Sequence, residues 1–494
     1  MMNIGFDNEL YIKKQSEHIK ERMKKFGNKL YLEFGGKLFD DYHAARVLPG
    51  FDVNGKIRLL KEFKDNAEVI FCINANDIEK SKIRADIGVT YDQDLFRLVD
   101  SMRESGLYVN SVVITQYNGQ HSADIFRNKL ERRGVRTYIH YPIAGYPGNV
   151  DLIVSEQGYG KNEYIETTKP LVIVTAPGPC SGKLATCLSQ LYHEYKKGNV
   201  AGYAKFETFP IWNLSLKHPV NLAYEAATAD LQDVNMIDPF HLEAYGQLAV
   251  NYNRDVEVFP LLKTILHKIS GEDVYLSPTD MGVNMVGYCI IDDEIVREAS
   301  KQEIIRRYYR TWCDYKLGRI DEQAVEKIEL IMKQLDLKKE DRHAVVPSLA
   351  KAEEKGTPVI AIEMPDGKII TGKTSKLMTA AASSVINSIK YLANLADELL
   401  LLSPIVLEPI LKLKKEILGY KNGILNLEEV LIALSICAPT NPMAHEALSN
   451  VGKLKGCEAH SSALVTNSDE LAFKKLGINL TCEPTFPSKD LFYV

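Results

Sequence analysis

The segment TKPLVIVTAPGPCSGKLATCLSQLYHEYKKG, residues 168–198, decides the fold class. Its run LVIVTA is short, apolar and β-branched, which is typical of a strand buried in a parallel sheet. The helix that follows carries apolar residues on one face and is expected to pack on that sheet: Leu184, Cys187, Leu188 and Leu191. A Gly/Pro-rich connection joins strand and helix. The segment therefore predicts one strand–loop–helix unit of an α/β fold.

The loop of this segment predicts a phosphate site. The first amides of a helix have no acceptor within the helix, the helix dipole favours anions there, and Lys183 adds a full positive charge. The pattern departs from a Walker loop, since Pro177 stands where its first Gly belongs and Leu184 where the magnesium-binding hydroxyl belongs. A compact turn with a solvated lysine stays open as the alternative. The candidate phosphate ligands are Gly178, Ser181, Gly182, Lys183 and Thr186.

A second glycine loop follows the predicted strand KLYLEFGG, residues 29–36. Lys37 comes directly after it, with His43 and Arg46 close behind. Lysine and arginine side chains are suitable clamps for a phosphate or a carboxylate, and ligands of open α/β sheets bind at the carboxyl edge. We expect these three side chains to face the first loop; a turn with surface charges is the alternative.

Asp230 and Asp280 are the candidate metal ligands. Asp230 lies in a segment rich in acids, amides and aromatic residues, and Asp280 lies in a Gly/Pro turn. An acid beside a phosphate loop can place Mg²⁺. No HExxH spacing selects one set of ligands. Possible cofactors are accordingly Mg²⁺ with ATP or another nucleotide.

The order of the predicted elements divides the chain into three domains. Helices and strands alternate through residues 1–150, as in an α/β domain with a parallel sheet. A second, P-loop-like α/β domain covers 165–335, and a third α/β domain covers 345–494 and begins with two strands around the turn at 365–367. The ligand is expected between the first two domains.

Composition and charge exclude several classes of protein. The 494 residues have a net charge of −5 and a pI near 6.2, which gives no electrostatic footprint for nucleic acid or anionic membrane. The longest apolar run, 392–419, is interrupted by Pro404, Pro409 and charged residues, so it cannot span a bilayer as one helix. The N-terminus has no apolar core of a signal peptide, and the eight cysteines form no CxxC pair. These features predict a cytoplasmic protein with reduced thiols.

Several long motifs resemble a bacterial cytoplasmic family, over essentially the whole chain. They include KLYLEFGGKLFDDYHAARVLPGF at 29–51, TAPGPCSGKLATC at 175–187, HPVNLAYEAATADL at 218–231 and LKGCEAHSSALVT at 454–466. The family is known as domain of unknown function 1846, with UPF0371-type proteins as its members. The resemblance implies no established activity.

The third domain has a second resemblance of its own. Segments 361–390 and 437–466 resemble the strand–strand–helix, then helix–strand order of cytidine-deaminase-like domains, with helices inserted between. Such enzymes hold zinc with His/Cys-Ala-Glu on the first helix and Pro-Cys-x-x-Cys on the second. Here Ala380-Ala381-Ala382 and residues 439–443, Pro-Thr-Asn-Pro-Met, stand at those places. The resemblance implies this fold without its zinc.

Together these patterns predict a protein that binds a nucleotide or another phosphorylated small molecule. If it is an enzyme, the reaction is phosphoryl or nucleotidyl transfer or hydrolysis, with electrostatic stabilisation. The alternative is a non-catalytic oligomeric scaffold or assembly protein, in which the apolar helices near 391–418 drive association. Since apolar surface beyond what a small domain covers usually marks an interface, a homo-oligomer is expected.

Overall fold

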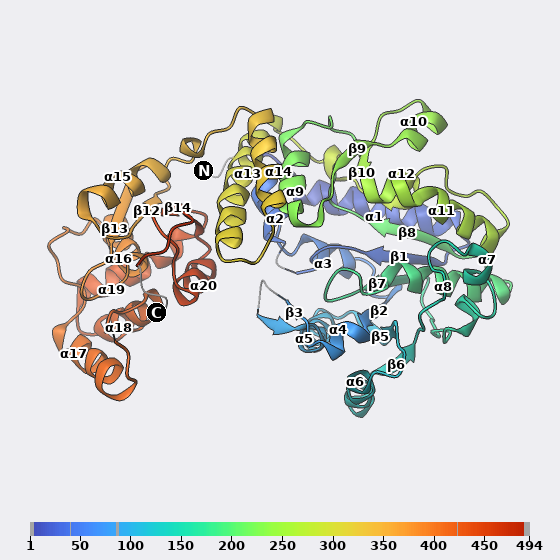
Figure 1. The fold of residues 1–494 in the computed structure, drawn as a ribbon, viewed down its shortest axis with the longest axis horizontal. Coiled ribbons are helices and arrows are strands. Elements are labelled where there is room, and N and C mark those ends of the chain that lie inside the picture. Colours follow the sequence, from blue (N-terminus) through green and yellow to red (C-terminus); the bar gives the residue numbers. More distant parts are fainter. Residues whose placement is uncertain (1–3, 40, 85–87, 422, 489–494) are drawn as a thin grey trace. The chain divides into compact units, whose positions relative to one another are not determined.

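A computed structural model describes residues 4–39, 41–84, 88–421 and 423–488 (Figure 1). The chain forms two compact units. Residues 1–225 and 233–300 make the N-terminal unit, and residues 226–232 and 301–494 make the C-terminal unit. Within the described residues, none of the helices is both long enough and apolar enough to cross a membrane.

The N-terminal unit is built on a seven-stranded sheet in the order β11-β8-β1-β7-β2-β5-β6. Every pair of neighbours is parallel. The strands' apolar runs are almost wholly buried, as expected of a parallel sheet covered on both faces. The strands are β1 (Leu30–Phe34), β2 (Ala67–Asn74), β5 (Tyr108–Thr115), β6 (Arg136–Ile139), β7 (Leu171–Thr175), β8 (Gly202–Phe206) and β11 (Gly282–Val283).

Strand β7, the predicted LVIVTA strand, lies between β1 and β2. Leu171 is in register with Leu30 on one side and with Ala67 on the other. Strands from 1–150 and from 165–335 therefore share one sheet, and the boundary predicted near 150–165 does not divide it. The physical reason is that a strand apolar on both faces is stable where it has a paired neighbour on each side, whatever its place in the chain.

Helices cover both faces of this sheet. The larger ones are α1 (Asn8–Lys25), α3 (Gly55–Lys61), α5 (Tyr91–Glu104), α6 (His121–Arg132), α8 (Lys183–Lys196) and α11 (Asn253–Ser270). The chain leaves β1 toward β2 and leaves β7 toward β8, which are opposite directions along the sheet. Because parallel crossovers are right-handed, α3 and α8 lie on opposite faces of the sheet. Helix α3 packs with α1 on one face, and α8 packs with α11 on the other.

Shorter elements complete the N-terminal unit. They are α2 (Tyr42–Val47), α4 (Ala75–Glu79), β3 (Ile83–Arg84), β4 (Val89–Thr90), α7 (Val150–Ile153), η1 (Tyr159–Lys161), β9 (Asn235–Ile237), α10 (Pro239–Tyr245), β10 (Val250–Tyr252), α12 (Pro278–Met281) and η3 (Val286–Tyr288). Helix α9 (Pro219–Ala227) and helix α13 (Asp293–Lys316) each run from this unit into the other.

The C-terminal unit has a four-stranded sheet in the order β13-β12-β14-β15. Strand β12 (Val359–Glu363) is antiparallel to both β13 (Ile369–Lys373) and β14 (Glu458–Ser461), and β14 is parallel to β15 (Asn479–Cys482). The hairpin predicted around 365–367 is confirmed, with Gly367 at φ +83°. The remaining elements are η2 (Ala229–Leu231), α14 (Glu322–Gln334), η4 (Lys339–Asp341), α15 (Val345–Lys355), α16 (Ala380–Leu392), α17 (Pro404–Lys412), η5 (Leu413–Ile417), α18 (Leu427–Cys437), α19 (Pro442–Ser449), η6 (Val451–Leu454) and α20 (Asn467–Leu476).

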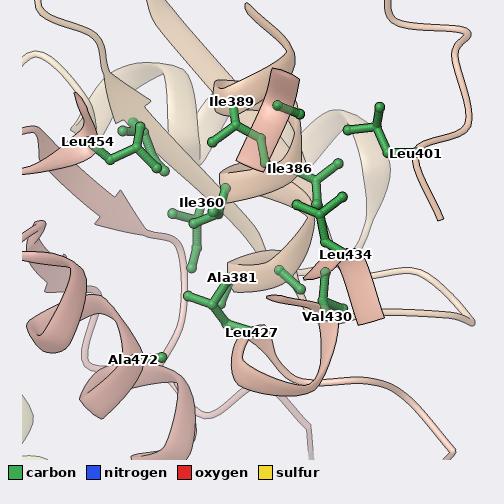
Figure 2. Close-up of a cluster of buried hydrophobic side chains, with 14 of the residues drawn as sticks. Ile360, Ala381, Ile386, Ile389, Leu401, Leu427, Val430, Leu434, Leu454 and Ala472 are labelled. Atoms are coloured by element: carbon green, nitrogen blue, oxygen red, sulfur yellow. The ribbon is translucent and has the colours of Figure 1, made fainter. Parts of the chain in front are cut away.

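The core of the C-terminal unit lies between its sheet and helix α16. Figure 2 shows Ile386 and Ile389 of α16 among Ile360 of β12 and Leu434 of α18, and all four are buried. Gly372 lets β13 approach the helix closely, because a Cβ there would lie 2.0 Å from the amide nitrogen of Ser384. The sequence prediction of a mixed α/β protein is therefore confirmed in both units.

Candidate functional site

The carboxyl edge of the N-terminal sheet gathers the polar loops. Because the strands are parallel, the segments that follow β1, β2, β5, β6, β7 and β8 all begin at this edge. The chain turns to opposite faces after β1 and after β7, which are neighbours, so their loops diverge. Ligands of doubly wound folds bind at such points of divergence.

The 176–182 loop, which follows β7, is held in one shape by its neighbours. The Thr115 hydroxyl at the end of β5 donates to the Ser181 carbonyl oxygen at 2.8 Å. Asn74 at the end of β2 donates from Nδ2 to the Cys180 carbonyl oxygen at 3.4 Å. Gly182 is left-handed at φ +85°, and a Cβ there would lie 2.9 Å from Thr115. Glycine is thus required where the loop enters α8.

The first turn of α8 presents hydrogen-bond donors without acceptors. Gly182 is the N-cap and supplies no side-chain acceptor, and the first return bond runs from the Thr186 amide to the Gly182 carbonyl oxygen at 2.9 Å. Among the described residues, the amides of Lys183, Leu184 and Ala185 have no acceptor. Lys183 is half-buried and forms no hydrogen bond or ion pair with any part of the chain that the structure describes. This turn can therefore accept an anion.

Two other predicted phosphate ligands help to shape the loop. The Ser181 side chain is buried, and its hydroxyl donates to the Gly178 carbonyl oxygen at 2.9 Å. The Thr186 hydroxyl is buried as well and accepts the Cys72 Sγ proton at 3.4 Å. Gly178 itself is needed for close packing, because a Cβ there would lie 2.5 Å from the Tyr91 ring.

The loop after β1 contains a buried ion pair. Asp41 caps α2 by accepting from the Ala44 amide at 3.2 Å, and Lys56 Nζ lies 2.7 Å from Asp41 Oδ2. Burial alone would raise the pKa of Asp41, but Lys56 and the hydrogen bonds hold it below its usual value. The sequence prediction missed Lys56, although a lysine on the buried face of α3 is a detectable signal.

The three predicted clamps differ in their surroundings. Lys37 is exposed, and Arg46 is half-buried. The His43 ring lies edge-on to Phe209 and Tyr224, with centroid distances of 5.3 and 5.6 Å. His43 therefore packs among aromatic rings.

A charge cluster around the buried Glu207 lies at the end of β8. Lys205 Nζ is 2.8 Å from Glu207 Oε1 and 2.5 Å from Asp255 Oδ2 at the start of α11. Burial raises the pKa of Glu207. The Lys205 ammonium lowers this pKa and the Asp255 carboxylate raises it, and the net shift is upward. A carboxyl group with a raised pKa at a carboxyl edge is a candidate general acid or base. We missed this cluster in the sequence; charged residues in an otherwise apolar strand were the available signal.

The α8 pocket, a recess whose empty volume of about 390 Å³ includes space open to solvent, adjoins the first turn of α8. Its walls come from Thr115 and Gln116 after β5, from residues within 140–162 after β6, and from Gly182, Ala185 and Thr186.

Two buried side chains in the wall of the α8 pocket have unused polar atoms. His140 Nε2 lies 3.1 Å from the Glu163 carbonyl oxygen, which can only accept, so Nε2 carries the proton. Burial lowers the pKa of His140 to about 4, so the ring is neutral at pH 7 and Nδ1 has a free lone pair. The Tyr159 hydroxyl is buried and has no hydrogen-bond partner among the described residues. Neither residue was identified from the sequence.

The predicted metal ligands have separate surroundings. Asp280 Oδ2 accepts from the Tyr245 hydroxyl at 2.8 Å and from the Leu276 amide at 2.9 Å, so it closes the 276–280 turn. Asp230 is exposed in η2, which belongs to the C-terminal unit. Across the described ranges, no three His, Cys, Asp or Glu side chains are grouped so as to hold a metal ion.

Comparison with known proteins gives the family. Residues 4–336 match the N-terminal model of "Domain of unknown function DUF1846", and residues 340–492 match its C-terminal model. A UPF0371 protein of Clostridium tetani (strain Massachusetts / E88) is 58% identical over 501 residues, with all of both chains covered. A UPF0371 protein of Clostridium botulinum (strain Kyoto / Type A2) is also 58% identical over the full length of both. The chain therefore belongs to the DUF1846 family of bacterial UPF0371 proteins.

Proposed function

We propose that the protein binds a phosphorylated small molecule, a nucleotide or a sugar phosphate, at the carboxyl edge of the N-terminal sheet. The single observation that carries the proposal is the first turn of α8, where the amides of 183–185 and the half-buried Lys183 have no partner among the described residues. Free amides and a lysine at a helix N-terminus are the groups that hold phosphate in P-loop-like sites. The preformed 176–182 loop supports this use of the turn.

Phosphoryl or nucleotidyl transfer or hydrolysis is the reaction class that such a site would serve. Glu207 would be its acid or base, because burial raises the pKa of this carboxyl and it lies at the same sheet edge. Lys37, His43 and Arg46 remain the predicted second side of the site, and Asp230 or Asp280 the predicted Mg²⁺ ligands. For Asp280, Oδ1 would be the coordinating oxygen, since Oδ2 accepts from Tyr245 and Leu276.

Calorimetry on the full chain tests the phosphate site, after a thermal-shift screen with nucleotides and sugar phosphates. Lys183→Ala should weaken binding roughly 10- to 100-fold, the scale of one charge-assisted contact, with little change in folding. The control is Lys129→Ala, because Lys129 is exposed in the last turn of α6 and has no partner among the described residues. Equal affinity in wild type and Lys183→Ala would contradict the proposal.

For the C-terminal unit we keep the deaminase-like fold without zinc as a proposal. The element order β12, β13, α16, then α18, α19 and β14 supports the likeness. Elemental analysis of the purified protein tests the absence of zinc. Stoichiometric zinc that disappears when Cys437 or Cys457 is replaced would show that the site exists.

A scaffold role is the second candidate function, and one observation favours it. Three apolar side chains in the segment 391–418 are largely exposed: Leu400 between α16 and α17 at 80%, Ile405 in α17 at 82% and Ile417 in η5 at 74%. Exposed apolar surface of this kind usually marks an interface, so homo-oligomerisation stays a proposal that applies with or without catalysis.

A further inference from the structure

The α8 pocket lies directly beside the turn proposed to hold phosphate. Gly182, Ala185 and Thr186 line the pocket and belong to the same first turn whose amides lack acceptors. A ligand whose phosphate lies on that turn therefore has its remaining atoms next to the pocket. The free amides and Lys183 account for phosphate binding but give the pocket no role. The side chains that line the pocket also differ from those that line a phosphate site.

We propose that the α8 pocket binds the heterocyclic base of a nucleoside phosphate, with His140 Nδ1 accepting a hydrogen bond from a base N–H group and the Tyr159 hydroxyl bonding to a second polar atom of the base. This inference rests on the proposed function for the position of the phosphate. It selects nucleotides over sugar phosphates as the ligand class.

His140 is the first reason for a base. The residue is 3% exposed, and its ring is fixed by the bond from Nε2 to the Glu163 carbonyl oxygen, so Nδ1 is a preoriented acceptor. No described residue donates to this nitrogen. An acceptor without a protein donor in a pocket wall is available to a donor of a ligand or of ordered water. The N–H and NH₂ groups of nucleobases are donors of this kind.

Tyr159 is the second reason. It is fully buried, and its hydroxyl has no partner among the residues that the structure describes. Buried tyrosines usually find a hydrogen-bond partner. A hydroxyl both donates and accepts, so it can match a ring nitrogen, a carbonyl oxygen or an amino group of a base. Together with His140 it gives the pocket polar groups that a phosphate alone does not need.

Aromatic and apolar side chains also line the pocket, beside polar ones such as Gln116 and Asn162. Tyr141, Ile143 and Tyr146 come from the segment after β6. Flat aromatic side chains favour planar ring ligands, since base–aromatic stacking is favourable for every base. A sugar phosphate has no planar ring to stack on these side chains.

Calorimetry on the full chain decides between the two ligand classes. The probes are AMP, GMP, CMP and UMP, with ribose 5-phosphate and inorganic phosphate as base-free references. At least one nucleotide should bind about 10-fold or more tightly than ribose 5-phosphate, the scale expected from stacking and hydrogen bonding of the base. Tyr159→Phe should weaken that nucleotide about 3- to 10-fold, as expected for one neutral hydrogen bond, and leave ribose 5-phosphate unchanged.

Two further variants complete the test, one that fills the pocket and one that serves as a control. Ala185→Leu fills the pocket from α8 with another strong helix former and should remove the preference for nucleotides. The control Tyr309→Phe alters a buried tyrosine of the C-terminal unit and should leave all affinities unchanged.

The outcomes separate this inference from the proposed function. If ribose 5-phosphate binds as tightly as every nucleotide and Lys183→Ala abolishes its binding, the phosphate site stands and the base pocket is wrong. Nucleotide affinity that is unchanged in Tyr159→Phe or in Ala185→Leu also overturns the base pocket. If nucleotides bind better than ribose 5-phosphate but are unaffected by Lys183→Ala, the base pocket stands and the phosphate turn is wrong. No binding of any probe overturns both.

Discussion

Two basic side chains, one in each unit, have opposite surroundings. In the C-terminal unit, Arg342 is 1% exposed and is surrounded by acceptors: a Glu458 carboxylate oxygen, the Thr481 hydroxyl at 2.9 Å and the Ala459 carbonyl oxygen at 3.0 Å. In the N-terminal unit, the half-buried Lys183 has no partner in the described part of the chain. Paired charges of the first kind maintain a fold, whereas an unpaired charge beside free amides is a place for a ligand.

Because the surroundings of Arg342 and Lys183 differ, experiments can separate effects on the free energy of unfolding from effects on ligand affinity. Changes to Arg342 should alter the stability of its unit without affecting ligands, and changes to the first turn of α8 should mainly alter binding. The chain offers one reporter for each unit, because its two tryptophans are Trp212 in the N-terminal unit and Trp312 in the C-terminal unit. Replacing either tryptophan by Phe isolates the fluorescence of the other unit.

The largest expected effect is that of Arg342→Ala. Removing the guanidinium takes one positive partner from Glu458 and leaves several buried acceptors without donors. Breaking a buried ion pair in this way should lower the free energy of unfolding by about 3–5 kcal/mol. Urea unfolding followed by Trp312 in the Trp212→Phe background measures it. Arg319→Ala is the matched control, because Arg319 pairs with Asp314 at 3.0 Å but its side chain is 49% exposed. A loss below about 1 kcal/mol for Arg342→Ala would show that the network is dispensable.

Acid should destabilise the N-terminal unit through His140. Burial lowers the pKa of His140 from 6.5 to about 4, so the unfolded chain binds a proton at a higher pH than the folded one. The contribution of the neutral His140 ring to the free energy of unfolding is complete above pH 6.5 and is lost as the pH falls toward 4. The loss is about 2 kcal/mol at pH 5. His140→Gln keeps a donor for the Glu163 carbonyl oxygen but cannot titrate. Trp212 fluorescence in the Trp312→Phe background should show a smaller drop between pH 7 and pH 5 in this variant; an equal drop would exclude His140 as the cause.

A comparison of two glycines isolates the effect of the loop shape. Gly182 and Gly134 both have left-handed backbones, with φ of +85° and +69°. A Cβ at Gly182 would lie 2.9 Å from Thr115, whereas one at Gly134 would meet no atom within 4 Å. Both Ala variants should lose about 1 kcal/mol from backbone strain, and Gly182→Ala should lose about 1 kcal/mol more and weaken phosphate binding. Equal losses and unchanged binding would show that the loop tolerates the contact.

The individual elements of the fold were predictable, but the strand order was not. The apolar β-branched run at 171–175 and the turn at 365–367 have local patterns that specify a strand and a hairpin, and both are confirmed. The position of β7 between β1 and β2 depends on pairing between residues more than 100 apart in sequence, such as Leu171 with Ala67. Each of these strands is apolar on both faces, so the sequence pattern does not distinguish one neighbour from another.

The candidate site was predictable to a similar degree. A glycine and a lysine at a strand–helix junction follow from local sequence, because the free amides are a property of any helix N-terminus. The roles of His140 and Tyr159 depend on burial and on missing partners, which arise when distant segments pack. A single histidine at the end of a strand and a single tyrosine in a Gly-rich polar segment have no sequence pattern that reveals either property.

The smallest effect on stability is expected where apolar side chains are already exposed. Ile405→Ser in α17 and Ile417→Ser in η5 remove side chains that are 82% and 74% exposed, so together they should change the free energy of unfolding by less than about 1 kcal/mol. If these residues form an oligomer interface, the double variant should be monomeric at micromolar concentration while the wild type is not, by light scattering. The control is Ile125→Ser on α6, a 44% exposed isoleucine of the N-terminal unit, which should leave the mass unchanged. A monomeric wild type, or a double variant with the wild-type mass, would contradict association through these helices.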